Sequence, residues 1–182
     1  MKKFTFLLFF CLSVLAFAED SFQKGYMLQQ DGSVWTEDAR GIMRWKESVK
    51  SGTAFDVYVT DLRDSNGNLI EEVKVANRLD GANNPIKNEF VRIRYKGEDA
   101  YVIKNRIAKD CELGIIQRTC AVYLSLNLSD VRLSPIEAGK IVATGNTYPV
   151  EGGFNFTEIT FFDEVNFIMI SGYVKEQNIG QP

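Results

Sequence analysis

The chain has 182 residues, with 21 Lys and Arg against 24 Asp and Glu, and it contains no histidine. The absence of histidine excludes a Ser-His-Asp or Cys-His nucleophile, a histidine general base near neutral pH and a His-ligated catalytic zinc. The length allows one large domain or two small ones, and the acidic excess does not favour a nucleic-acid-binding protein, which usually carries a basic stripe.

The first 18 residues have the three parts of a secretory signal peptide. Two lysines form a short positive region, an apolar run covers residues 4–15, and Ala-Phe-Ala at residues 16–18 gives a small-x-small cleavage pattern. The apolar run is shorter than the ~20 residues of a membrane-spanning helix. We therefore expect an exported protein, periplasmic, cell-surface or secreted, without a transmembrane anchor. Lipidation at Cys11 is a lesser alternative, because the bulky Phe10 precedes it.

Alternation of apolar and polar residues predicts β-strands along most of the remaining chain. Residues 53–63 and 69–76 flank the pair Asn66-Gly67. An Asn-Gly pair between two alternating runs favours a hairpin, because both residues tolerate positive φ. Residues 77–88 are polar and rich in turn formers, so we expect a surface loop there, and residues 90–95 form the next strand.

A second set of short alternating segments follows in the C-terminal part of the chain. These segments cover residues 121–126, 140–143, 148–150, 156–162 and 166–173. Short, regularly spaced strands are typical of small barrels and sandwiches. The sequence therefore predicts an all-β fold.

An internal repeat connects the two sets of strands. The first copy reads Phe90-x-x-Ile93-x-Tyr95, then Ala100-Tyr101-Val102, then Ile107. The second copy reads Phe156-x-x-Ile159-x-Phe161, then Gly172-Tyr173-Val174, then Ile179. Upstream, Gly52-x-x-Phe55-x-Val57 parallels Gly145-x-x-Tyr148-x-Val150.

This doubled order resembles the bacterial Src-homology-3-like (SH3b) domain. The second copy matches best, at Val131-Arg132-Leu133-Ser134-Pro135, Lys140-Ile141-Val142, Gly145 and Gly172-Tyr173-Val174. The first copy departs at its start, where Trp45 follows Arg44 and Gly52 comes early. The resemblance covers about residues 37–107 and 118–179, and it implies two small SH3-like barrels in tandem, since closure removes exposed sheet edges.

The resemblance and the charge pattern together suggest a division of the chain. We expect a signal peptide (1–18), an N-terminal segment (19–36), a first barrel (37–110) with a hairpin-and-loop insertion (61–88), a connector (111–120) and a second barrel (121–182).

Cys111 and Cys120 lie in the expected connector. In an exported protein an even pair of cysteines favours a disulfide over two free thiols. The closed ring would stabilise the protein by roughly 2.5 kcal/mol on the chain-entropy model. Two cysteines without histidine are too few for a structural zinc site, so we expect no metal and no cofactor.

Aromatic residues are the candidate ligand-binding groups. In the family that the chain resembles, an aromatic-lined groove often binds cell-wall peptides or protein segments, which implies such a role for Tyr101 and Tyr173 at equivalent positions of the two copies. Trp45 is added because of its position in the chain. A purely structural role for all three residues remains open, because Tyr and Trp suit both cores and recognition surfaces.

The alternating residues Arg92, Arg94 and Lys96 should share one face of a strand. They could read an anionic ligand, but such a row is more often the solvated side of a half-buried strand.

These features favour a non-catalytic, exported binding protein that recognises a cell-wall peptide, such as a peptidoglycan stem peptide, or an envelope protein. The alternative is a structural or assembly component of an envelope complex, with residues 61–88 as its contact surface. A cell-wall hydrolase ranks last, because it needs two carboxylates facing each other across a cleft and small barrels offer little depth for one.

Overall fold

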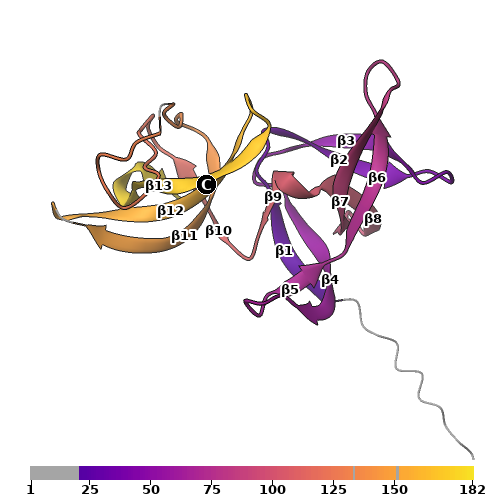
Figure 1. Cartoon of the computed structure of the whole chain (residues 1–182), viewed down its shortest axis with the longest axis horizontal. Coiled ribbons are helices and arrows are strands. Elements are labelled where there is room, and N and C mark those ends of the chain that lie inside the picture. Colours follow the sequence, from indigo (N-terminus) through magenta and orange to yellow (C-terminus); the bar gives the residue numbers. More distant parts are fainter. Residues whose placement is uncertain (1–20, 133, 151) are drawn as a thin grey trace, which may run out of the picture.

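The structure is a computed structural model that describes residues 21–132, 134–150 and 152–182. The expected signal peptide over residues 1–18 lies outside the described residues. The described chain folds into two β-sheets that lie side by side, with two short 3₁₀ helices (Figure 1). The prediction of an all-β fold is therefore confirmed. Within the described residues, no helix combines the length and the apolar character needed to cross a membrane.

Sheet A is built from the N-terminal part of the described chain. Its strands are β1 (Ser21–Met27), β2 (Asp31–Glu37), β3 (Ile42–Lys50), β4 (Ala54–Arg63), β5 (Leu69–Glu71), β6 (Val73–Leu79), β7 (Pro85–Tyr95), β8 (Glu98–Ile103) and β9 (Ile107–Lys109). The 3₁₀ helix η1 (Lys104–Arg106) separates β8 from β9.

Sheet B is built from the C-terminal part. Its strands are β10 (Glu112–Ile116), β11 (Ile141–Val150), β12 (Phe154–Asp163), β13 (Ile168–Lys175) and β14 (Ile179–Gly180), and the 3₁₀ helix η2 (Glu176–Asn178) precedes β14.

Five strands of sheet A follow the same order as the five strands of sheet B. Sheet A contains the path β8-β7-β4-β1-β9 and sheet B the path β13-β12-β11-β10-β14, with a 3₁₀ helix before the last strand in both. The register also agrees: Ile93 pairs with Ala100, and Ile159 pairs with Gly172. The predicted repeat around Tyr101 and Tyr173 therefore corresponds to a repeated structure.

The upstream part of the predicted repeat is wrong. In the structure, the counterpart of Gly52 is Gly139 and not Gly145. Both Gly52 and Gly139 have φ of +83°, and their N–H groups donate to the carbonyls of Met27 and Ile116, which sit at matching ends of β1 and β10. The left-handed conformation explains why glycine recurs there. Gly145 lies within β11, so its spacing to an aromatic residue was coincidental.

The domain boundaries also differ from those expected. The segment 19–36 contains β1 and all but the last residue of β2, and β1 pairs with both β4 and β9 inside sheet A. The expected connector 111–120 contains β10, which pairs with both β11 and β14 inside sheet B. These strands were missed because each carries a glycine at a close approach and shows weak apolar alternation.

The insertion at 61–88 consists of two hairpins. The predicted β4–β5 hairpin is confirmed, with Arg63 opposite Leu69 and Gly67 at φ +84°. The expected loop 77–88 is instead mostly strand, because β6 and β7 pair along their length and only a short turn separates them. The Asp80 carboxylate forms that turn by accepting the N–H groups of Ala82 and Asn84. The prediction failed because the polar composition of residues 77–88 does not distinguish the turn from the strands on either side of it.

Apolar side chains lie on both faces of β2, β7 and β8. Val34, Val91 and Val102 belong to the main core of sheet A, whereas their neighbours Trp35 and Phe90 belong to a second cluster that Met43 and Ala76 complete. This second cluster is enclosed because β6, β3, β2, β8 and β7 form a closed circuit of pairings.

The two sheets pack against each other through an apolar junction. Leu28 of sheet A and Phe162 of sheet B are fully buried there, together with Ala143. The backbone N–H of Gln30 also donates to the Glu164 carboxylate at 2.8 Å. The junction joins the two halves into one packed body.

Candidate functional site

Tyr101 lies on the wall of a cavity of about 530 Å³ in sheet A. Its ring projects from β8 toward the Trp35–Phe90 cluster, which leaves it half-buried. The cavity opens over β5, β6 and β7. Its other lining residues are mainly polar: Thr60, Glu71, Glu72, Val73, Lys74, Arg92 and Asp99.

Arg92 organises the charged side of this cavity. Its guanidinium lies 4.0 Å from the ring centroid of Tyr58 and donates to Asp99 at 2.6 Å and to Glu72 at 3.3 Å. The Tyr58 hydroxyl also donates to Asp99. The hydrogen bond from Arg92 and that from Tyr58 hold the pKa of Asp99 below its ordinary range.

Arg94 extends the same stack toward the N-terminal strand. Its guanidinium lies 4.5 Å from the ring centroid of Phe22, and it donates to the Tyr58 hydroxyl at 2.8 Å. Lys96 pairs with Glu47 at 2.7 Å. Arg92 and Arg94 thus share one face of β7 as predicted, whereas Lys96 lies in the turn after β7 with φ of +53°. Aromatic faces and carboxylates already engage all three residues, so they do not form a free anion-binding patch.

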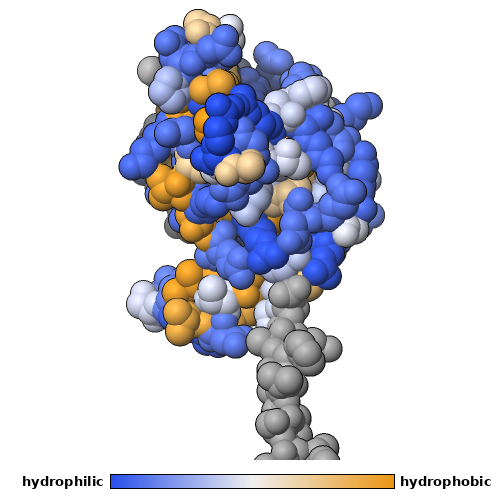
Figure 2. Space-filling model, turned by 90° about the vertical axis from the view of Figure 1, so that its right-hand side faces the viewer, coloured by the Kyte–Doolittle hydropathy of each residue, from blue (hydrophilic) through white to orange (hydrophobic). Residues whose placement is uncertain are grey.

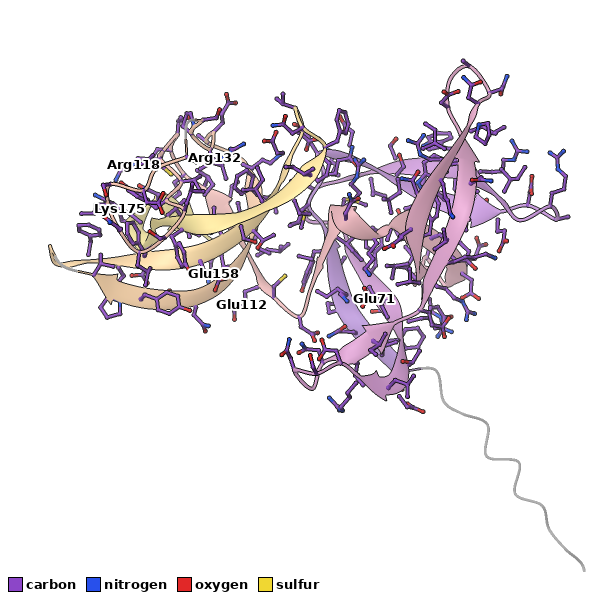
Figure 3. The ribbon with its side chains drawn as sticks, viewed as in Figure 1. Glu71, Glu112, Arg118, Arg132, Glu158 and Lys175 are labelled. Atoms are coloured by element: carbon purple, nitrogen blue, oxygen red, sulfur yellow. The ribbon has the colours of Figure 1, made fainter. Side chains whose placement is uncertain are left out.

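A second cavity of about 540 Å³ adjoins the first, because Glu71 lines both. Glu71 comes from β5 (Figure 3) and pairs with Lys109 at 2.6 Å and Lys104 at 3.5 Å. Burial alone would raise the pKa of Glu71, but the hydrogen bond from Lys109, a backbone hydrogen bond and the charges of Lys109 and Lys104 together outweigh burial and lower the pKa. The second cavity is lined further by Lys87, Asn88, Glu89, Ile103, Asn105, Ile107 and Met169. We refer to the two cavities together as the Glu71 groove.

Trp45 and Tyr173 lie away from the Glu71 groove. Trp45 is 60% exposed on β3, opposite Trp35 in the register. Tyr173 lies in sheet B, where its ring centroid is 6.0 Å from that of Tyr148 and its backbone pairs with Tyr123. The structure therefore does not bring the three predicted residues together, and only Tyr101 lines the groove.

The main groove residues that the sequence did not single out are Glu71 and Asp99. Tyr58, which is buried and contacts Arg92 of the groove, was not singled out either. Glu71 pairs with Lys109, which lies 38 residues further along the chain, so local pattern could not reveal that pair. Asp99 pairs with Arg92 across the β7–β8 hairpin. Alternation pointed to Arg92, but its aromatic partner on β4 becomes visible only when β4 and β7 pair.

Cys111 and Cys120 are both free thiols, so the predicted disulfide is not formed. Cys111 packs against the junction between the sheets, whereas Cys120 packs in the core of sheet B. Strand β10 separates them and spans about 16 Å, whereas disulfide-bonded Cα atoms are about 4.4–6.8 Å apart. Burial raises the pKa of both thiols.

Within residues 21–132, 134–150 and 152–182, no group of three or more Cys, Asp or Glu side chains is arranged to hold a metal ion. No protein-family model matches the chain, and no curated protein and no solved structure matches it significantly. The chemistry of the groove must therefore be read from its own residues.

Proposed function

We propose that each sheet forms an SH3-like barrel and that the chain is a non-catalytic, exported binding protein. Support comes from the strand order and the 3₁₀ helix, which occur twice and agree in register. The proposal extends the resemblance to SH3b domains suggested by the repeated Tyr-Val motifs. Export rests on the signal-like residues 1–18 of the sequence.

The ligand we propose is a short peptide that carries both carboxylates and amines, such as a peptidoglycan stem peptide or a segment of an envelope protein. The observation that carries this proposal is the mixed charge of the Glu71 groove. Lys74 and Lys87 stand along it together with Glu72 and Glu89. Alternating signs match a zwitterionic peptide and repel a polyanion, so nucleic acid is not the proposed ligand. Tyr101 offers an amphipathic face for the body of the peptide.

The electrostatics of the groove support binding rather than hydrolysis. A glycosidase needs a carboxylic acid whose pKa is raised so that it can protonate the leaving group. In the groove, the pKa values of Glu71 and Asp99 are instead both lowered. Both carboxylates would therefore stay ionised at neutral pH, which suits salt bridges to a ligand amine.

A structural or assembly role is the second candidate, because the insertion at 61–88 exposes apolar side chains. Leu62 is 67% exposed, Val75 54% and Val73 39%. The side of the molecule that carries the β2–β3 and β6–β7 hairpins is mainly hydrophilic with smaller apolar areas between (Figure 2). These exposed side chains would supply the apolar part of a contact with a partner protein.

Retention on purified peptidoglycan sacculi tests the first candidate. We expect the full chain to co-sediment with sacculi and Lys74→Ala to lose most of this retention. Lys96→Ala is the matched control, because Lys96 also pairs with a glutamate but lies outside the groove. Equal retention of both variants would contradict the proposal that the Glu71 groove binds the peptide. No retention of the wild-type chain, combined with no crosslinked envelope protein, would refute the binding function.

A further inference from the structure

A third cavity, of about 260 Å³, lies where the two sheets meet. Sheet A contributes residues from β2, β6, β8 and η1, and sheet B contributes the turn after β12. The lining residues are Gln29, Ser33, Trp35, Arg78, Ile103, Arg106 and Phe167. We infer that this junction cavity binds a small organic anion, with its carboxylate held by Arg78 and Arg106. The site is separate from the Glu71 groove and does not depend on its proposed function.

Arg106 is held in the cavity by aromatic rings and not by an acidic partner. Its guanidinium lies 4.5 Å from the ring centroid of Phe162 on β12 and 5.5 Å from that of Phe167 in the turn between β12 and β13. Its Nε donates a weak hydrogen bond to the side chain of the neighbouring Asn105, at 3.3 Å. Stacking of this kind leaves the edge of the guanidinium free to donate hydrogen bonds in its plane.

Arg78 enters the same cavity from β6. Its Nε donates to the Asn88 side chain at 2.9 Å, and its guanidinium lies 5.8 Å from the ring centroid of Trp35. In the described part of the chain, no carboxylate is within ion-pair distance of Arg78 or Arg106. Arg92, by contrast, contacts two carboxylates. Asp80 and Glu164 act on Arg78 and Arg106 only from beyond ion-pair distance, so neither guanidinium has a direct anionic partner. A bound anion would reduce the repulsion between the two arginines.

The electrostatic environment of Arg106 also favours a bound anion. Burial lowers the pKa of Arg106, Glu164 partly offsets that effect, and the nearby charge of Arg78 lowers the pKa further. A bound anion would relieve the repulsion between the two arginines, because each guanidinium would then face an opposite charge.

The ring of Trp35 lines the cavity, and its indole N–H is buried behind that surface. Its side chain is 9% exposed, and its indole Nε1–H has no hydrogen-bond partner among the described residues. Buried polar groups without partners are rare in folded proteins, so this indole would gain a hydrogen bond if a small rotation of the ring brought it to a ligand. Ser33 and Gln29 supply further polar groups on the same wall.

The remaining walls restrict the ligand to a small molecule with a flat or apolar body. Ile103 and the rings of Trp35 and Phe167 line the cavity beside the two arginines. The volume is below the roughly 300–1,000 Å³ of sites for drug-sized ligands. Two convergent guanidinium groups match the planar oxygens of a carboxylate better than a single lysine would. A small aromatic or unsaturated acid combines these properties.

Calorimetric titration of the full chain with benzoate tests the inference. Benzamide is the neutral isostere of benzoate. Acetate is a carboxylate without the apolar ring, and inorganic phosphate is an anion of another type. We expect saturable binding of benzoate, at least tenfold weaker binding of the other three compounds, and a shift of the Trp35 indole N–H resonance that Trp45 does not show.

Two variants and a control make the test specific. Arg78→Gln, on the hairpin edge, and Arg106→Gln should each weaken benzoate binding at least tenfold, and Arg40→Gln, which is exposed and outside the cavity, should leave it unchanged. If Arg106→Gln does not fold by circular dichroism, Arg78→Gln decides the result. Equal affinity for benzamide, tighter binding of phosphate, unaltered binding by Arg78→Gln, or no saturable binding of benzoate would each overturn the inference.

Discussion

Gly25 and Gly114 occupy the same position in the two sheets, two residues before the end of β1 and of β10. A Cβ atom at Gly25 would lie 2.6 Å from Cγ2 of Val57, and one at Gly114 would lie 2.5 Å from Cγ2 of Ile179. Both neighbours are β-branched and packed, so their methyl groups cannot rotate away freely. Glycine is therefore required twice for the same reason, which is that an adjacent strand crosses closely.

Substitution of either glycine by alanine should destabilise the protein. We expect Gly25→Ala and Gly114→Ala each to lower the free energy of unfolding by about 2 kcal/mol, as overpacking of a core does. Urea denaturation followed by circular dichroism measures the change. Gly81→Ala is the control, because nothing lies within 4 Å of its Cβ position. An equal loss in all three variants would show that the close approach is not the cause.

The ion pair between Arg132 and Asp163 joins the long loop before β11 to the end of β12. The Asp163 side chain is 8% exposed, and Arg132 is labelled in Figure 3 on the loop side of sheet B. Removing the arginine leaves a buried carboxylate without its cation, so Arg132→Ala should cost about 2 kcal/mol. A double-mutant cycle with Asp163→Asn measures the coupling.

The exposed pair Lys24–Asp56 provides the control for this cycle. Both of its side chains are 53% exposed, and such pairs contribute about 0–1 kcal/mol. A coupling for Arg132 and Asp163 no larger than that of the exposed pair would argue against a stabilising role for the buried ion pair.

The turn between β2 and β3 should weaken at low pH. The N–H of Ile42, with further hydrogen bonds from Arg44 and Arg40, lowers the pKa of Asp38 to about 2. An unfolded aspartate has a pKa of about 3.9, so its stabilising contribution is present above that pH and is lost as the pH falls toward 2.

We therefore expect the stability difference between the wild-type chain and Asp38→Asn to be constant from about pH 5 to 7 and to shrink between about pH 4 and 2. Urea midpoints measured across this range test the prediction. A difference that stays constant down to about pH 2 would mean that the Asp38 charge does not stabilise the turn.

The free thiols of Cys111 and Cys120 should react slowly. Burial raises both pKa values, so the thiolate fraction near neutral pH is small. Without reductant, we expect iodoacetamide to modify both residues in denaturant, and to modify them in the folded protein at a rate that increases as the pH rises above about 8. Peptide mass spectrometry locates the modification. A peptide in which Cys111 and Cys120 remain linked would restore the disulfide that the sequence predicts.

The junction between the sheets should make the described chain unfold as one unit. Phe162 is fully buried against Leu28, and its replacement by alanine should lower the free energy of unfolding by about 3 kcal/mol. Leu128→Ala is the control, because Leu128 is 47% exposed on the loop before β11. A wild-type chain that already unfolds in two separate transitions would contradict a stabilising junction.

The sequence by itself determined the strand character and the repeat. Period-two alternation places apolar side chains on one face of a strand, so an all-β chain could be predicted locally. The spacing around Tyr101 and Tyr173 was informative because paired strands constrain residues at a fixed register. The hairpin at Asn66-Gly67 was also readable, because the requirement for positive φ at Gly67 is local.

Only the tertiary structure decided which residues meet. Tyr58 stacks with Arg92 because β4 pairs with β7, and Arg106 meets Phe162 because the sheets pack together. Such contacts depend on register and packing between segments distant in the chain, which local propensity does not encode. The same reason explains the missed strands β1 and β10: their sequences alternate weakly, and the neighbouring strands on both sides hold them in place.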